Sequence, residues 1–308
     1  MRTAVSGGAG FIGSNLVDVL LAAGHEVTVL DNLSTGYAEH VNADARLLTV
    51  DVADADAALE ATRGAEVVFH LAAARAVLRS VQDPLSTDRS NTRGTLSVLE
   101  AARQNGVRRV ICASSSSVYG GASITPTPES APLMPRSPYA VSKMAGEHYA
   151  RVYWELHGVE TVSIRFFNVF GPRQRPDSAY AAVIPIFIAA LRARSEIEVH
   201  GDGLQSRDFT YVDDAVAGIV SAAQTPSEIC AGHVYNIAGG SEHNLLEIVT
   251  ILERLTETQA SLRHVEPRAG DIRRSRADLA AAAADLGWSP AVGFEEGLAR
   301  TVAWFTER

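Results

Sequence analysis

Short runs of β-branched and aliphatic residues alternate with amphipathic stretches through the first 165 residues of the chain. The apolar runs predict strands at residues 3–5, 26–30, 47–50, 67–70, 109–112 and 161–165. The stretches between them carry apolar residues at helical spacing and predict helices at residues 14–23, 55–62, 93–105 and 140–157. Strands that alternate with helices are typical of a parallel sheet covered on both faces, so we expect a doubly wound α/β fold.

The rest of the chain is less regular. Helices are predicted at residues 181–194, 213–224, 245–256 and 294–306, and loops at residues 171–179 and 266–274. An alanine cluster at residues 280–284 is also typical of a helix. We therefore predict a first domain over residues 1–165 and a smaller C-terminal α/β domain over residues 166–308, with some segments of the second returning to the first.

The composition narrows the class of protein. With 27 Lys and Arg against 36 Asp and Glu, the formal charge is −9, and no basic block offers a partner for nucleic acid or an anionic membrane. The longest apolar stretch, residues 183–191, is too short to cross a bilayer. Two cysteines, Cys112 and Cys230, and the absence of a signal-peptide pattern favour a reducing cytoplasm. The nine histidines show no metal-binding spacing, so no metal is predicted.

A glycine-rich loop joins the first predicted strand to the first predicted helix. Gly7, Gly10 and Gly13 stand at GxxGxxG spacing, with Phe11 and Ile12 between the last two. Such glycines permit a tight turn and a close approach of the backbone to a pyrophosphate, and the helix N-terminus adds free N–H groups. For a glycine motif considered alone, a strand–helix turn that binds nothing is the alternative.

An acidic residue stands where a dinucleotide-binding loop needs one. The second predicted strand runs into Asp31, 18 residues beyond Gly13, and Asn32 follows. A carboxylate there can accept both hydroxyls of the adenosine ribose and repels a 2′-phosphate, which favours NAD over NADP. Residues 1–165 therefore read as a Rossmann-type NAD-binding domain and residues 166–308 as mainly a substrate-binding domain. Five residues near later strand ends are further candidate cofactor contacts, namely Asp51, Val52, Leu71, Ala72 and Ala73, and so is Asn91, just before the helix predicted at residues 93–105.

A serine-rich strand end and a Tyr–Lys pair suggest catalytic chemistry. Ser115 lies in the run of serines that follows the strand predicted at residues 109–112. Tyr139 and Lys143 are four residues apart on a predicted helix and share one face. A nearby ammonium, or a positive nicotinamide ring, lowers the pKa of a phenol from about 10 and makes it a usable base. An ordinary surface helix that carries a Tyr–Lys pair is the alternative.

These motifs resemble those of the extended short-chain dehydrogenase/reductase family, specifically its nucleotide-sugar epimerases and dehydratases, over essentially the whole chain. The resemblance is carried by the glycine loop, Asp31-Asn32, residues 70–73, 115–119 and 165–168, the Tyr139/Lys143 pair, and residues 207–209 and 268–271. It implies that Tyr139 is the catalytic base, that Lys143 binds the nicotinamide ribose, and that Ser115 holds the reacting oxygen. Ser116 and Ser117 are further candidate sugar contacts.

The resemblance also implies a nucleoside-diphosphate site. Asn168, Arg207 and Arg268 would contact the diphosphate, and Asp271 would approach the nucleotide ribose. Two arginines present forked donors that suit phosphate oxygens. For either arginine considered alone, exposed ion pairing with a neighbouring aspartate is the alternative. Members of the family usually form homodimers through two helices, here those predicted at residues 93–105 and 140–157.

The residues after Ser115 bear on the reaction. In this family, oxidation at C4 of the sugar is the shared first step, after which dehydratases usually use Asp-Glu directly after the catalytic Ser/Thr and uronate decarboxylases a Glu two positions after it. Ser116 and Ser117 occupy those positions and supply no acid, so a UDP-sugar 4-epimerase is predicted. A net dehydrogenase or reductase, and a non-catalytic NAD-binding protein on the same fold, are the rival interpretations.

Arg175 bears on the sugar. Many related epimerases have an acidic residue at this position, and the arginine resembles UDP-glucuronate 4-epimerases, which need a cation for the C6 carboxylate. A fixed guanidinium can also hold that carboxylate away from the geometry for decarboxylation. Asn168 resembles the broader hexose group instead, and a solvated loop arginine is the alternative for Arg175. UDP-glucuronate/UDP-galacturonate is the preferred substrate pair, and UDP-glucose/UDP-galactose or an N-acetylated hexose is the alternative.

Overall fold

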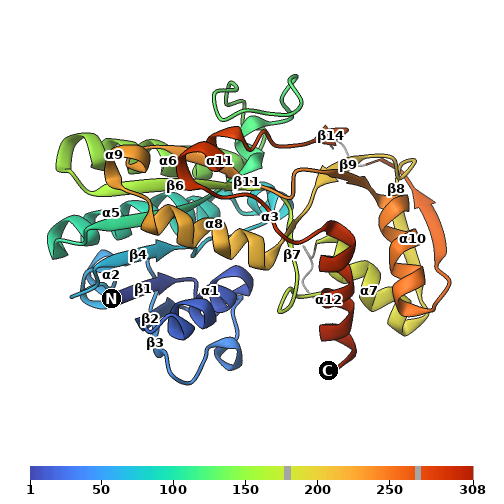
Figure 1. The fold of residues 1–308 in the computed structure, drawn as a ribbon, viewed down its shortest axis with the longest axis horizontal. Helices are drawn as coiled ribbons and strands as arrows, with labels where there is room; N and C mark the ends of the chain where they lie inside the picture. Colours follow the sequence, from blue (N-terminus) through green and yellow to red (C-terminus); the bar gives the residue numbers. More distant parts are fainter. Residues whose placement is uncertain (177–181, 268–271, 308) are drawn as a thin grey trace.

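Seven parallel strands form a central sheet with helices on both faces in the computed structural model, which describes residues 1–176, 182–267 and 272–307 (Figure 1). The strand order is β11-β6-β5-β4-β1-β2-β3. These strands are β1 (Arg2–Ser6), β2 (Glu26–Asp31), β3 (Arg46–Thr49), β4 (Val67–His70), β5 (Arg109–Ser115), β6 (Glu160–Phe166) and β11 (Val234–Ile237). The predicted doubly wound, Rossmann-type α/β fold is confirmed.

The sheet is buried on both faces because its central strands are nearly continuous apolar runs. All four residues of β4 are buried. One face is covered by α2 (Ala55–Ala61), α5 (Gly94–Asn105) and α6 (Pro138–His157), and the other by α1 (Phe11–Ala22) and α8 (Val212–Gln224). Leu99 shares a core with Val68 on the first side, and Leu16 shares one with Val29 on the second. Burial of these side chains from water is the main force that holds the layers together.

A smaller part of the chain lies beside the sheet, to its right in Figure 1. Its strands are β7 (Val169–Phe170) paired with β10 (Thr210–Tyr211), β8 (Glu196–His200) paired with β13 (Ser261–Val265), and β9 (Ser206–Asp208) between β12 (Glu242–Asn244) and β14 (Arg274–Ser275). Its helices are α7 (Val183–Ala193), α10 (Leu245–Thr256) and α12 (Phe294–Thr306). The chain crosses between the two parts more than once, because α8, α9 (Ser227–Cys230), β11 and α11 (Ala280–Leu286) pack at the β6 edge of the main sheet.

The helices were predicted more completely than the strands. α10 and α12 begin and end where the sequence predicts, and the predicted strand at residues 67–70 is β4, whereas β11 was not predicted because four residues are too few to show a period. Three short elements before α5 were also missed: α3 (Val77–Gln82), α4 (Pro84–Asp88) and the π-helical turn η2 (Arg89–Arg93). They lack a continuous apolar stripe, so periodicity could not indicate them.

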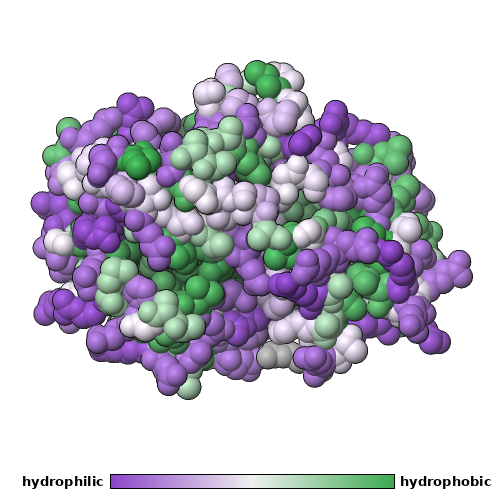
Figure 2. Space-filling view, viewed as in Figure 1, coloured by the Kyte–Doolittle hydropathy of each residue, from purple (hydrophilic) through white to green (hydrophobic). Residues whose placement is uncertain are grey.

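The molecular surface is mostly hydrophilic at the periphery of the face drawn in Figure 2, with separate hydrophobic patches between. Within the described ranges, no helix combines the length and the apolar character that a membrane span requires.

Candidate active site

One large pocket opens where the strands of the central sheet end. Its volume is about 530 Å³, and it is lined by the loops that follow β1, β2, β4 and β5, by α6, and by the loop after β7. Parallel strands bring their carboxyl ends to one edge of the sheet, so residues far apart in sequence meet there. All of the predicted cofactor contacts except Asn91 line this pocket, as do Ser115, Tyr139 and Lys143.

The glycine loop has the shape that its spacing predicts. Gly7 has φ +74°, and a Cβ atom built on it would lie 2.6 Å from the backbone nitrogen of Ala72, which only glycine avoids. A Cβ atom on Gly13 would collide with the carbonyl oxygen of Gly7. Gly10 precedes α1, and no side chain caps this helix. Its N-terminus therefore presents backbone N–H groups to the pocket, as a diphosphate site requires.

Asp31 ends β2 at the wall of the same pocket. Its carboxylate accepts hydrogen bonds from the backbone N–H groups of Ala9, at 3.0 Å, and Leu33, at 2.9 Å, and the residue is 8% exposed. These bonds fix the carboxylate beside the glycine loop, where the adenosine ribose of a dinucleotide lies in this fold. The glycine cradle, the uncapped helix and this carboxylate together fit NAD.

Asn91 is the one predicted cofactor contact that does not line the pocket. Its amide oxygen accepts a hydrogen bond from the backbone N–H of Ala74 at 2.7 Å, and its Nδ2 donates to the Ser142 hydroxyl at 2.9 Å. The side chain is 1% exposed. Asn91 thus joins the loop after β4 to the helix that carries Tyr139, and it acts on the pocket through these neighbours.

Tyr139 and Lys143 face the pocket from α6. Ser137 begins this helix by accepting a hydrogen bond from the Ala140 N–H at 3.1 Å, with Pro138 at the first helical position. Tyr139 therefore lies in the first turn, at the pocket end of the helix. Lys143 lies one turn further on, and its ammonium donates to the carbonyl oxygen of Ala113 at 2.8 Å. Burial lowers the pKa of Lys143 to about 8.

Ser115 meets Tyr139 from the end of β5. Burial raises the pKa of the Tyr139 phenol above its usual value, while a hydrogen bond to the Ser115 side chain and the charge of Arg75 act in the opposite direction. The Ser115 hydroxyl also accepts a hydrogen bond from the Ser117 N–H at 3.2 Å. Besides the Lys143 ammonium and the nicotinamide ring expected from the sequence, the charge of Arg75 also acts to lower the pKa of this phenol. No pattern in the sequence indicated Arg75.

A buried ion pair fixes the serine strand relative to the tyrosine helix. Glu147 of α6 binds Arg165 of β6 with an Oε2–Nη2 distance of 2.7 Å, and it also accepts a short hydrogen bond from the Ser114 hydroxyl. Arg165 in turn donates to the Tyr119 hydroxyl at 2.8 Å. Because both ions are bonded and buried, this group holds β5, β6 and α6 in one arrangement.

Two serines that follow Ser115 also line the pocket. The Ser117 hydroxyl oxygen is buried and makes no hydrogen bond with any group in the described residues. A buried hydroxyl without a partner costs free energy in the folded chain. It is therefore a candidate to bind a group that a ligand brings, as predicted for Ser116 and Ser117.

Arg75 follows the alanines after β4 and points into the cavity. It lines the pocket, its side chain is exposed there, and it makes no hydrogen bond or ion pair with a described residue. Desolvation in the cavity, and then the charge of Arg175, lower the pKa of Arg75, while Tyr139 raises it. The next residue, Ala76, has φ +95°, a strained conformation for a residue with a side chain. Arg75 is the one cation between residues 71 and 78, but a single arginine forms no motif, so the sequence did not indicate it.

Arg175 lines the pocket beside the loop that follows β2. Its guanidinium stacks on the Tyr37 ring at 4.4 Å from the centroid, and Nη1 donates to the carbonyl oxygen of Thr35 at 3.3 Å. Both contacts belong to the loop after β2, which begins at Asn32, directly after Asp31. Arg175 therefore bridges the loop after β7 and a cofactor-binding loop, a contact that its sequence position did not predict.

A second cavity of about 490 Å³ adjoins the first and shares Asn168 and Val169 with it. It lies among α7, β8 and β9, and Arg207 lines it. Arg207 donates to the Ser206 carbonyl oxygen at 2.8 Å, and Asn168 donates to the Asp208 carbonyl oxygen at 2.8 Å. Asn168 and Arg207 are thus near each other, as predicted, whereas Arg268 and Asp271 lie outside the described residues.

No group of three or more histidine, cysteine, aspartate or glutamate residues in the described part of the chain is arranged to hold a metal ion.

Comparison with known proteins identifies the family. The profile of the NAD dependent epimerase/dehydratase family matches residues 3–238. The chain is 42% identical over 315 residues to a UDP-glucose 4-epimerase of Mycolicibacterium smegmatis, with 100% of this chain and 99% of the relative covered. It is 33% identical over 317 residues to a UDP-glucuronate 4-epimerase of Thermodesulfobacterium geofontis, with 98% and 95% covered. The crystal structure of a Thermotoga maritima UDP-glucose 4-epimerase with UDP-glucose matches with a TM-score of 0.95 at 35% identity, covering 100% of this chain and 99% of that one.

The chain belongs to the NAD dependent epimerase/dehydratase family. The family and its cofactor, NAD, were predicted correctly from the sequence, and so was the class of protein, an NAD-dependent enzyme of the epimerase type.

Proposed function

We propose that this enzyme is a UDP-sugar 4-epimerase. The observation that carries the proposal is the meeting of Ser115 and Tyr139 at one end of a pocket whose other end is the glycine loop and Asp31. A sugar bound against the serine would have its C4 hydroxyl beside the phenol. UDP as the nucleotide is supported by the names of the relatives.

The chemistry follows from the positions of these groups. Ser115 would bind the C4 oxygen, and Tyr139, as phenolate, would take its proton. NAD+, when bound, would accept the C4 hydride and then return it to the opposite face of the 4-keto sugar. Lys143 would hold the nicotinamide ribose, and Tyr139 would give the proton back to the C4 oxygen. No proton or electron is gained or lost overall, so the cofactor is recycled.

Epimerisation is favoured over elimination because no acid among the described residues lies at the reacting end. Among the described residues that line the pocket, the carboxylates are Asp31 and Asp51, both beside the cofactor loops. Ser116 and Ser117 cannot protonate a carbanion at C5 or a leaving hydroxyl at C6. A dehydratase or a decarboxylase would lack its acid among these residues.

The preferred substrates are UDP-glucuronate and UDP-galacturonate. Arg75 and Arg175 are among the cations that line the pocket, and a carboxylate is the substituent that would complement them. UDP-glucose and UDP-galactose are the second candidates, because the M. smegmatis relative that is 42% identical is a UDP-glucose 4-epimerase. Asn168, Arg207, Arg268 and Asp271 would bind the UDP portion in either case.

The test is to incubate the purified enzyme separately with UDP-glucuronate, UDP-glucose and UDP-N-acetylglucosamine and to identify the products by NMR. We expect interconversion at C4 without stoichiometric consumption of added NAD. Conversion of a neutral sugar but not of the uronate would contradict the preferred substrate. Release of a UDP-pentose would indicate a decarboxylase, and consumption of one NAD per turnover would indicate a dehydrogenase.

We also propose a homodimer in the cytoplasm. Leu156, near the end of α6, is 73% exposed, and Val141 and Val152 on the same helix are 48% and 41% exposed, which suits a helical face that meets a second copy. The cytoplasm is supported by Cys112 and Cys230, which are both free and buried. Sedimentation velocity measures the oligomeric state, and a monomer at micromolar concentration would contradict the dimer.

A further inference from the structure

Two segments that are distant in the sequence pair with each other along one wall of the large pocket. The loop between η3 (Ser116–Tyr119) and α6 contributes Thr127, whose N–H donates to the Arg276 carbonyl oxygen at 2.8 Å. The Thr127 carbonyl oxygen accepts a hydrogen bond from the Asp278 N–H at 2.9 Å. Thr127 and Ser275 both line the pocket. The paired segments, Thr127 and residues 275–278, therefore form a wall of the pocket.

Asn236 binds both segments of this wall to the main sheet. It lies on β11, is fully buried, and does not itself line the pocket. Its Nδ2 donates to the carbonyl oxygens of Thr127 at 3.0 Å and Asp278 at 3.2 Å. Its Oδ1 accepts a hydrogen bond from the Tyr119 hydroxyl at 2.7 Å. One side chain thus joins β11 to the last residue of η3 and to both members of the wall.

An amide is the group that suits all three partners. The two carbonyl oxygens need N–H donors, and the Tyr119 hydroxyl, which accepts a hydrogen bond from Arg165 at 2.8 Å, has its own proton to donate. Aspartate has almost the same shape but would place an oxygen against two carbonyl oxygens, and an apolar side chain would leave all three partners unpaired. A buried polar group with every partner satisfied specifies one arrangement of its neighbours.

A second buried side chain holds the wall at the neighbouring residue. Asp208 is fully buried, and its carboxylate accepts hydrogen bonds from the N–H groups of Ala277 and Gly240, each at 3.0 Å. Ala277 directly precedes Asp278 in the chain. Because Asp208 holds this segment independently, loss of the Asn236 amide would displace the wall without releasing it from the fold.

We propose that Asn236 is a positioning residue for the sugar site, which sets the space for the sugar ring by holding this wall in place. The inference rests on the proposed function, because it takes the sugar to lie at the Ser115 and Tyr139 end of the pocket. Asn236 would touch neither substrate nor cofactor and would act through Thr127 and Ser275.

This role predicts an effect on binding rather than on chemistry. If the wall is displaced, a sugar nucleotide binds only the fraction of molecules in which the wall is in place, and its apparent affinity falls by that fraction. Once the sugar is bound, the wall is restored. The reacting groups lie on other elements, Ser115 on β5 and Tyr139 on α6, so the rate of the bound complex should change little.

The test separates KM from kcat. In Asn236→Asp, we expect KM for whichever of UDP-glucuronate and UDP-glucose the wild type converts to rise about 10-fold, while kcat stays within about threefold and bound NAD is retained. Calorimetry with UDP-glucose on the NAD-bound protein should show the same fall in affinity without turnover. Asn236→Ala removes the donors without adding repulsion, so it should give a smaller rise in KM, and it replaces Asn236→Asp if that variant does not fold.

Asn105→Asp is the matched control. The Asn105 Nδ2 donates to the Leu59 carbonyl oxygen at 2.7 Å and so joins α5 to α2, and Asn105 does not line the pocket. The same substitution therefore breaks the same kind of bond away from the site. It should lower the free energy of unfolding in urea and leave KM unchanged.

Several outcomes would overturn the inference. A lower kcat with unchanged KM would assign Asn236 to the reacting groups, and loss of bound NAD would assign it to the cofactor site. Unchanged kinetics in a destabilised Asn236→Asp, or an equal rise of KM in Asn105→Asp, would leave Asn236 with a role in stability alone. The proposed function is tested separately by turnover of the wild type. If the wild type binds UDP-glucose but inverts no sugar at C4, the proposed function fails, while the affinity for UDP-glucose still tests whether Asn236 positions the wall.

Discussion

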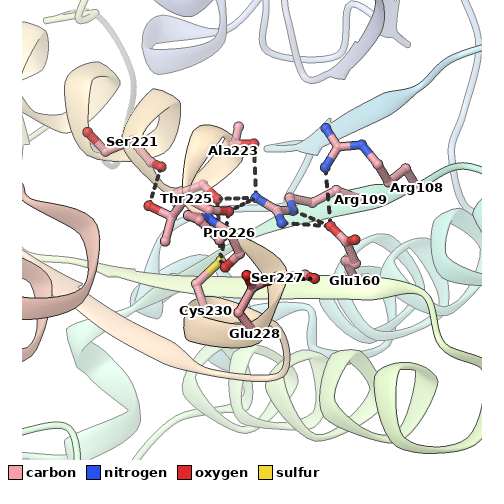
Figure 3. A network of polar contacts seen from close by, with 11 residues as sticks. Arg108, Arg109, Glu160, Ser221, Ala223, Thr225, Pro226, Ser227, Glu228 and Cys230 are labelled. Carbon is pink, nitrogen blue, oxygen red and sulfur yellow. Dashed lines mark hydrogen bonds and ion pairs between the residues drawn. The ribbon is translucent and has the colours of Figure 1, made fainter.

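Two arginines at opposite ends of the strands of the central sheet, Arg109 and Arg75, have opposite environments. Arg109 begins β5 at the edge where the strands start, is 1% exposed, and donates through Nη1 to the carbonyl oxygens of Ala223 and Thr225 at 2.9 and 2.6 Å (Figure 3). Its Nε binds Glu160 at 2.7 Å. Arg75 lies beyond the other edge, opens to the cavity, and makes no such bond with a described residue.

The difference between the two environments distinguishes a charged group that stabilises the fold from polar groups that are available to a ligand. At the start of the strands, the buried charge is neutralised by a carboxylate and by the carbonyl end of α8, where the helix dipole also favours a cation. At the end of the strands, donors such as those of Arg75 and Ser117 are left for a ligand. A fold tolerates unsatisfied groups only where something else binds them or where other interactions offset their cost.

The largest effect is expected at the reacting end, from Tyr139→Phe. Removal of the phenolic oxygen leaves no base beside Ser115, and turnover should fall by about 10⁴-fold, the upper limit of what a general base contributes. Bound NAD, measured by absorbance after gel filtration, should be retained. Tyr149→Phe on the same helix is the matched control and should keep full activity. Substantial activity in Tyr139→Phe would overturn the assignment of the base.

At the opposite edge, Arg109→Met should reduce stability without a direct effect on chemistry. It leaves Glu160 and the end of α8 without their buried partner, and loss of one member of a buried pair costs about 3–5 kcal/mol. Urea denaturation measures the change. Arg108→Met is the control, because Arg108 binds the same Glu160 at 3.2 Å but from an exposed position, and its loss should cost less than about 1 kcal/mol. Equal costs would show that burial of Arg109 contributes nothing.

Lys143 gives a prediction on pH. Because burial lowers its pKa to about 8, its ammonium is present below that pH and is lost as the pH rises through it. If the ammonium holds the nicotinamide ribose, kcat should decline above about pH 8. In Lys143→Arg, whatever activity remains should show no such decline up to about pH 10, since a guanidinium stays protonated there. An unchanged decline in this variant would assign it to another group.

The sequence predicts the part of the site that local patterns determine. The spacing of Gly7, Gly10 and Gly13 fixes a turn that only glycine can adopt, and Tyr139 and Lys143 share a face because helical periodicity is regular. These features depend on neighbours in sequence. The main helices were predicted for the same reason.

What the sequence could not predict depends on contacts between distant segments. Asn91 is a predicted cofactor contact, but its amide group bonds Ala74 and Ser142 because η2 packs against α6. Arg175 stacks on Tyr37, which lies 138 residues earlier in the sequence. Arg75 enters the cavity where Ala76 adopts a positive φ that no pattern of side chains indicates.

The smallest effect is expected for Ser117→Ala, and its two readouts should move in opposite directions. The Ser117 hydroxyl is buried and has no hydrogen-bond partner in the described structure, so its removal should stabilise the ligand-free chain by up to about 1 kcal/mol. If this hydroxyl binds the sugar, the same change should lower kcat/KM by about tenfold. Ser115→Ala is the contrast, because the Ser115 hydroxyl already accepts the Ser117 N–H and its loss should not stabilise the fold. A stabilised Ser117→Ala enzyme with unchanged kcat/KM would mean that the unsatisfied hydroxyl has no part in binding, and that the contrast between the two edges of the sheet does not extend to this residue.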